Sequence, residues 1–88
     1  MIEEELVIPN ALGLHARPAA LLAEAAGKFR SAVIISKDGV EVNAKSIMGL
    51  MLLAAEFGSK VKIRVDGPDE LQTVMALRQL FQKKFGEK

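Results

Sequence analysis

The 88-residue sequence contains no cysteine, tryptophan or tyrosine, and it has a single histidine. Without cysteine there can be no disulfide, thiolate metal site or cysteine nucleophile, so stability must come from burial of side chains, which suits the cytoplasm. The net charge of +1 lacks the basic excess that nucleic-acid-binding domains usually show. The longest apolar run, residues 47–55, is far shorter than the roughly 20 residues that cross a bilayer. We therefore expect a cytoplasmic protein that binds no nucleic acid and does not insert into membranes.

The N-terminal stretch "MIEEELVIP" has acidic residues where a secretory signal has basic ones, and it lacks a long apolar core. No export signal is expected there. Apolar residues make up 50% of the chain and charged residues 26%, a balance typical of folded domains and not of disordered chains. The length leaves no material for a second core, so residues 1–88 are predicted to form a single domain.

Apolar patterning predicts seven elements along the chain. Strands are expected over residues 4–8, 31–36, 40–44 and 60–65, and helices over 16–26, from Ser46 towards Gly58, and after Gly67. Asp38-Gly39 between two β-branched runs predicts a tight hairpin. In "KVKIRV" the residues alternate, which predicts that Val61, Ile63 and Val65 face a core while Lys60, Lys62 and Arg64 face water.

The last helix shows terminal signals that match the helix dipole. They predict Pro68 at its first position, Asp69 and Glu70 in its first turn, Lys83 and Lys84 in its last turn, and a buried stripe of Leu71, Val74, Leu77 and Phe81. The element order is β-α-β-β-α-β-α with amphipathic strands. This order predicts an α+β open-faced sandwich, a four-stranded antiparallel sheet with three helices on one face. Periodicity leaves the strand order open, and a ferredoxin-like arrangement also fits the first six elements.

The single histidine, His15, lies at the predicted start of the first helix. Free amides and the positive helix end there disfavour the imidazolium form, which leaves a neutral ring with a lone pair for attack on an electrophile. A phosphoryl group on the ring would face helix amides and the Arg17 guanidinium, both of which stabilise anions, and Pro18 preorganises the helix start. A capping or surface histidine has the same spacing. No second histidine or cysteine is available as a metal ligand, and no hydrolase motif stands out, so we predict neither a metal site nor an enzyme.

Ser46 lies at a second predicted helix start. Serine is a favoured N-cap, and the same position would also accept a phosphate with little disturbance. The short helix that follows cannot bury all its large apolar residues at once, which predicts an exposed apolar patch suited to protein partners. The residues in question are Ile47, Met48, Leu50, Met51 and Leu53.

The stretches "GLHARPAA" (13–20) and "KSIMGLM" (45–51) resemble those of HPr, the histidine-containing phosphocarrier family of the bacterial phosphoenolpyruvate-dependent phosphotransferase system. The likeness extends over essentially the whole chain. It implies that His15 accepts a phosphoryl group on Nδ1 from enzyme I and passes it to enzyme IIA domains, without a cofactor, and that HPr kinase/phosphorylase modifies Ser46. A transcriptional regulator is a further expected partner, through the phosphoserine form, and we expect the chain to be a monomer. The partner surface implied by the resemblance comprises Leu14, Ala20, Glu24, Ile47, Met48 and Met51.

Leu12 departs from the family pattern, which often has a serine, threonine or asparagine at this position. Leucine cannot hydrogen-bond to the phosphoryl group, so the backbone amides of Ala16 and Arg17 and the Arg17 side chain would hold it. The stretch around His15 also resembles the nitrogen-related phosphotransferase paralogue. A mainly regulatory paralogue, or a module that acts through its phosphoserine form, therefore stays open beside a role in sugar uptake.

Overall fold

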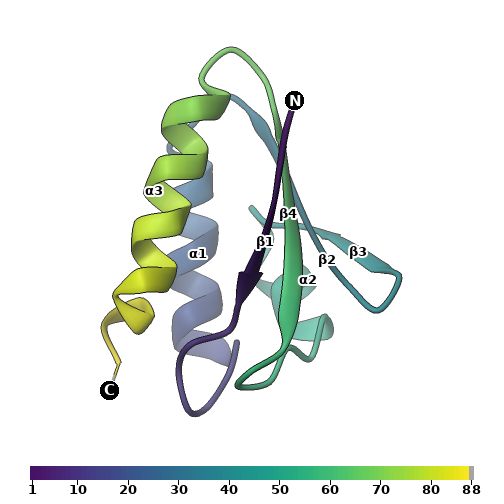
Figure 1. Ribbon diagram of the computed structural model, residues 1–88, viewed down its shortest axis with the longest axis vertical. Helices are drawn as coiled ribbons and strands as arrows, with labels where there is room; N and C mark the ends of the chain where they lie inside the picture. Colours follow the sequence, from purple (N-terminus) through teal and green to yellow (C-terminus); the bar gives the residue numbers. More distant parts are fainter. Residues whose placement is uncertain (88) are drawn as a thin grey trace.

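The computed structural model describes residues 1–87, which form a four-stranded antiparallel sheet covered by helices (Figure 1). The strands are β1 (Ile2–Val7), β2 (Ala32–Lys37), β3 (Val40–Asn43) and β4 (Lys60–Asp66), in the spatial order β1-β4-β2-β3. The helices are α1 (Ala16–Gly27), α2 (Ile47–Leu52) and α3 (Glu70–Gln82), followed by a short 3-10 turn, η1 (Lys84–Gly86). The predicted fold class and element order are confirmed, and the strand order resolves what periodicity left open.

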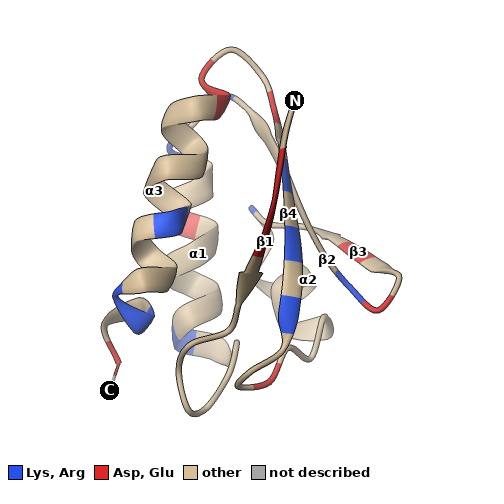
Figure 2. Cartoon of the chain, viewed as in Figure 1, with Lys and Arg blue, Asp and Glu red and all other residues tan. Residues whose placement is uncertain are grey.

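Alternation along the strands separates a core face from a solvent face. Val61, Ile63 and Val65 of β4 are buried, as predicted. On the outer face the acidic strand β1 lies beside the basic strand β4 (Figure 2), with Glu3 opposite Arg64 in the register. Opposite charges on neighbouring strands favour this pairing. The Asp38-Gly39 turn joins β2 to β3 with positive φ at both residues (52° and 82°), as a tight hairpin requires.

Several predicted element ends are wrong. The first strand runs over Ile2–Val7 instead of 4–8, and α2 ends at Leu52 instead of near Gly58. Helix α2 stops early because Leu53 turns into the core and Ala54 adopts a left-handed conformation with φ of 53°. A residue in that conformation cannot continue a right-handed helix.

The ends of α3 also differ from the prediction. Pro68 precedes the helix, since Asp69 is the N-cap and Glu70 the first helical residue. Lys83 and Lys84 lie beyond the last turn, where Lys84 and Phe85 both have positive φ. Leu71 is 60% exposed, so it does not belong to the buried stripe; Thr73 takes its place beside Val74, Leu77 and Phe81.

Helices α1 and α3 run antiparallel on the same side of the sheet, so the end of α3 lies beside the start of α1 (Figure 1). Phe85, 1% exposed, fixes the turn after α3 by packing on Phe81, with ring centroids 4.9 Å apart. The last described residue, Glu87, is thereby brought to the start of α1. Within residues 1–87 the structure has no helix that is long and apolar enough to cross a membrane.

Candidate functional site

His15 is the N-cap residue of α1, with an extended backbone (φ −80°, ψ −170°). Its carbonyl oxygen accepts the first helical hydrogen bond, from Ala19 N at 2.9 Å. Its side chain makes no capping hydrogen bond and is 36% exposed. The backbone of His15 therefore starts the helix, while the imidazole is free to interact elsewhere.

The loop before His15 is tied to the segment that follows α2. Leu14 N donates to the Ala55 carbonyl oxygen at 2.8 Å. Gly13 has φ of +71°, and a Cβ atom at this position would lie 2.6 Å from that same oxygen. Only glycine tolerates both the left-handed backbone and the close approach. Gly13, the first residue of "GLHARPAA", thus allows the loop before His15 to pack closely against Ala55.

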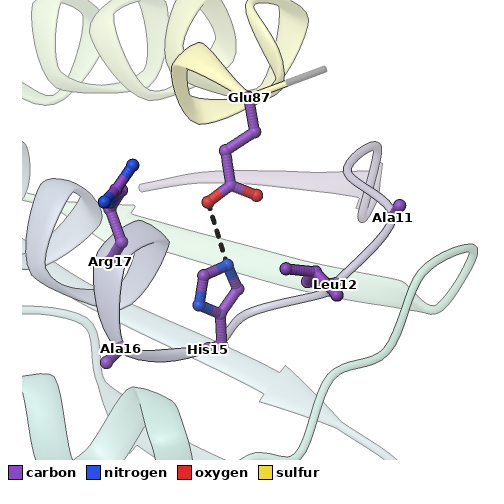
Figure 3. Close-up of a pocket in the computed structure, with 6 residues that line it drawn as sticks. All are labelled: Ala11, Leu12, His15, Ala16, Arg17 and Glu87. Carbon is purple, nitrogen blue, oxygen red and sulfur yellow. Dashed lines mark hydrogen bonds and ion pairs between the residues drawn. The ribbon is translucent and has the colours of Figure 1, made fainter.

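A pocket of about 620 Å³ opens at the start of α1 (Figure 3). Its lining consists of Ala11, Leu12, His15, Ala16, Arg17 and Glu87. As at any helix start, the first amides, those of Ala16 and Arg17, have no carbonyl one turn earlier in the helix to bond, and the hydrogen bonds within residues 1–87 include none that they donate. The structure places His15, Ala16 and Arg17, which the sequence predicted as one site, in the lining of one pocket. Within residues 1–87 no cluster of three or more metal-binding side chains is present.

Glu87 completes the site, and sequence reasoning missed it. One carboxylate oxygen, Oε2, lies 2.9 Å from His15 Nε2. The other oxygen, Oε1, accepts a hydrogen bond of 2.9 Å from Nδ2 of Asn10, which also donates to the Gly13 carbonyl at 2.7 Å. The Asn10 hydrogen bond is the largest cause that lowers the Glu87 pKa below its usual value, and the His15 contact adds to it. Glu87 is 72 positions from His15, so no local spacing could have indicated the contact.

The electrostatic surroundings of the ring therefore differ from those predicted. The ring lies at the positive start of α1, as the sequence indicated, but an ionised carboxylate also contacts Nε2. This carboxylate is close enough to Arg17 for the guanidinium to contribute to its lowered pKa. The sequence analysis counted only the positive groups and did not include this carboxylate. In Figure 3, Nε2 points to Glu87, whereas Nδ1 lies on the side of Ala16.

Ser46 has the predicted N-cap geometry. Its Oγ accepts a hydrogen bond of 3.0 Å from Gly49 N in the first turn of α2. The side chain is half-buried. The side chain of Ser46 thus caps the helix that it starts, whereas the side chain of His15 does not.

The apolar surface predicted around α2 is present in part. Leu50 and Leu53 are buried, while Met48 is 76% exposed and Ile47 and Met51 are nearly half exposed. Glu24 is exposed and Ala20 is half-buried. Leu14 is wrong as a surface residue, because it is only 4% exposed: the bond to Ala55 turns its side chain into the core. Leu52 is 76% exposed and was missed, because the predicted helix continued past it.

The fold and the site define a class of small α+β domains. In this class a partly exposed histidine lies beside an arginine at a helix start, where an anion bound to the ring would be stabilised. Comparison with known proteins narrows the class. The family model described as "PTS HPr component phosphorylation site" matches residues 2–83. The chain is 51% identical over 87 residues to phosphocarrier protein HPr of Xylella fastidiosa, covering 99% of this chain and 98% of the relative.

Solved structures agree with this match. A crystal structure of HPr-C-His from Thermoanaerobacter tengcongensis is 48% identical, with a TM-score of 0.96 over 100% of this chain and 99% of that chain. A second structure, described as an HPr dimer from the same organism, is 48% identical with a TM-score of 0.80 over 99% and 100% of the chains. The chain belongs to the HPr family of phosphocarrier proteins of the phosphotransferase system.

The family match confirms the resemblance and the prediction of a carrier instead of an enzyme. The expectation that this chain is a monomer stays a prediction, since one of the similar structures is described as a dimer. The roles of individual residues are likewise predictions, to which the geometry adds Glu87 and Asn10.

Proposed function

We propose that this chain carries a phosphoryl group on Nδ1 of His15, which it accepts from enzyme I and passes to enzyme IIA domains in the cytoplasm. The observation that carries the proposal is the arrangement at the start of α1. There Nδ1 lies on the side of Ala16, whose amide, like that of Arg17, donates no hydrogen bond within residues 1–87, while Nε2 contacts Glu87. Membership of the HPr family supports the same chemistry. No cofactor is required.

The transfer step follows from these groups. The Nδ1 lone pair forms a bond to phosphorus, and the bond from phosphorus to the donor breaks, with its electron pair leaving on the donor. The new phosphoryl oxygens then lie against the Ala16 and Arg17 amides and near the Arg17 guanidinium. Helix amides and arginine favour such anions, so the product is stabilised without a metal ion.

His15→Ala tests the acceptor. Incubated with phosphoenolpyruvate, Mg²⁺ and enzyme I, the wild-type chain should form an acid-labile phosphoryl adduct, and the variant should form none. The imidazole makes no capping bond, so thermal unfolding should show that the variant is folded. Glu3→Gln, on the outer face of β1, is a matched control that should accept the group at the wild-type rate. An adduct on His15→Ala would contradict the proposal.

We further propose that Ser46 is a regulatory site for HPr kinase/phosphorylase. Ser46 starts α2, and α2 packs against α1, whose first residues include Arg17. A phosphate here adds charge on the surface that also carries Met48 and Met51, where it would oppose docking of enzyme I. This charge would leave the fold intact, because anions are favoured at a helix start.

Ser46→Asp should lower the rate of transfer from enzyme I by roughly tenfold, through weaker docking. Ser46→Ala is the matched control: it should transfer at the wild-type rate but lose about 1 kcal/mol of stability with the cap. Rates are measured over a range of enzyme I concentrations, so that an effect on docking appears as a raised half-saturation. Equal rates for Ser46→Asp and the wild type would exclude this regulation.

The partner surface proposed for enzyme I, enzyme IIA and a transcriptional regulator comprises Ala20, Glu24, Ile47, Met48 and Met51. Three of these are exposed or half-exposed apolar residues of α2. Methionine adapts to several partners because its side chain is flexible and polarisable. A monomer would leave this surface open to each partner in turn.

A further inference from the structure

We propose that Glu87 is a positioning residue that fixes the His15 ring with its proton on Nε2 and its lone pair on Nδ1. This inference rests on the proposed function, because it assigns which nitrogen is ready to accept the phosphoryl group. Glu87 touches no phosphoryl oxygen in this role and acts only through the ring.

The hydrogen-bond chemistry allows one assignment. An ionised carboxylate can only accept hydrogen bonds. Glu87 Oε2 lies 2.9 Å from Nε2, so Nε2 must be the donor and carry the hydrogen. In a neutral imidazole the other nitrogen then holds the lone pair. That nitrogen is Nδ1, on the side of the ring towards Ala16 (Figure 3).

The carboxylate is itself held in place. Asn10 is fully buried, and its Nδ2 donates both to Glu87 Oε1 and to the Gly13 carbonyl. This fixes the orientation of the Asn10 amide, since its nitrogen must face the two oxygens. From the other side, Phe85 anchors the chain two residues before Glu87 in the core. Asn10 therefore orients the Glu87 carboxylate, and the carboxylate in turn orients the His15 ring. We call this chain of contacts the relay.

The relay is also consistent with the transfer step. When the Nδ1 lone pair bonds to phosphorus, the ring becomes a cation with its hydrogen still on Nε2. Glu87 already faces that nitrogen, so the positive charge forms against a carboxylate. A preplaced charge of this kind needs no rearrangement during the reaction. Arg17 lines the same pocket and is the cation available to the expected phosphoryl oxygens.

Two substitutions of equal charge separate positioning from electrostatics. In Glu87→Gln, Asn10 Nδ2 still requires an acceptor, so it takes the amide oxygen and the new NH₂ group turns to Nε2. That group can only donate, so Nε2 must offer its lone pair and the proton moves to Nδ1. In Glu87→Ala the ring has no partner and chooses its own tautomer. Both variants remove one negative charge, so any difference between them is due to the hydrogen bond.

The tautomer is read by ¹⁵N NMR of the single histidine at a pH where the ring is neutral. We expect hydrogen on Nε2 in the wild type and on Nδ1 in Glu87→Gln. The rate of phosphorylation is measured with phosphoramidate, a small donor that needs no docking surface, and with enzyme I. The order should be wild type, then Glu87→Ala, then Glu87→Gln, with the last slower than the wild type by roughly tenfold or more. Glu3→Gln is the control for loss of one charge.

The inference is overturned if Glu87→Gln keeps hydrogen on Nε2, or if the two Glu87 variants have equal rates. Thermal unfolding of both variants checks that they are folded, and the NMR signal reports the ring independently of transfer. A wild-type chain that accepts no phosphoryl group from either donor would instead overturn the proposed function, while the tautomer comparison would still decide the role of Glu87.

Discussion

Two carboxylates lie at opposite ends of the α1 and α3 pair, and they are bonded in different ways. At the end where α3 starts, Asp69 accepts hydrogen bonds from Arg30 N (2.9 Å), Ser31 N (2.9 Å) and Ser31 Oγ (2.6 Å). These bonds tie the start of α3 to the segment between α1 and β2. At the other end, Glu87 accepts one bond from Asn10 and faces His15.

The difference between the two lies in the partners. The donors around Asp69 are backbone amides and hydroxyl groups, which keep their hydrogens throughout the accessible pH range. The key partner of Glu87 is an imidazole, the one side chain whose unperturbed pKa puts its charge change near neutral pH. Asp69 therefore has a structural role, because its donors do not change protonation state. Glu87 belongs to the site, because its partner is a reactive imidazole.

The largest expected effect is on stability, at the Asp69 end. In Asp69→Asn one oxygen becomes an NH₂ group that meets a backbone N–H, so at least one bond is replaced by a repulsive contact. We expect the Tm to fall by on the order of 5–10 °C. Phosphoryl acceptance at 25 °C should be unchanged, because Asp69 is at the far end of α1. A measured loss of acceptance with full folding would show that the two ends are coupled.

A second effect concerns acid. The Ser31 side-chain hydrogen bond and then the Arg30 amide hold the pKa of Asp69 at about 2, below its ordinary value of 3.8. A lowered folded-state pKa contributes stability that is complete above the unfolded value of about 4 and is lost as the pH falls towards 2. The pKa of Glu87 is lowered in the same direction. Denaturant unfolding between pH 5 and pH 2 should therefore show falling stability.

The acid effect can be assigned by comparing variants. Asp69→Asn should flatten the fall in stability between pH 4 and pH 2 more than Glu87→Gln does, because Asp69 has the larger set of donors. Glu3→Gln, on the open face of the sheet, should leave the slope unchanged. Identical slopes in wild type and Asp69→Asn would mean that other carboxylates control acid unfolding.

The smallest expected effect is at Leu12, on the rim of the Glu87 end. Leu12 is 75% exposed and lines pockets on both sides of His15. Leu12→Ser would add a hydroxyl able to bond the phosphoryl group, and we expect the phosphohistidine to hydrolyse roughly threefold more slowly. Stability should change little, since the side chain is at the surface. The half-life of isolated phosphoprotein at pH 7 measures this, and an unchanged value would mean that the hydroxyl does not reach.

Most of the fold was predictable from the sequence because the strands alternate and the turns have clear chemistry. Asp38-Gly39 and the alternating "KVKIRV" each specify their structure locally. The helix ends were less predictable, since α2 stops at a left-handed alanine and α3 at a left-handed lysine, residues that give no turn signal. The prediction that Leu71 is buried was wrong because the buried face of α3 includes Thr73 instead, a polar residue that an apolar pattern does not select.

The site was predictable only where its parts are close in the sequence. His15, Arg17 and the first amides of α1 lie within one helical turn, so a short motif indicates them together. Leu14 was misjudged because the direction of its side chain depends on a hydrogen bond to Ala55, 41 positions away. The contact of Glu87 with His15 depends on the antiparallel arrangement of α1 and α3, which no local sequence pattern indicates.

The contact between residues 15 and 87 has a consequence for synthesis. Ribosomes release a chain from its N-terminus, so His15 and the start of α1 emerge long before the carboxylate that faces them. Until residue 87 has emerged, the ring has a helix behind it but nothing on Nε2. The geometry around this histidine is therefore complete only after every strand and helix of the domain has emerged.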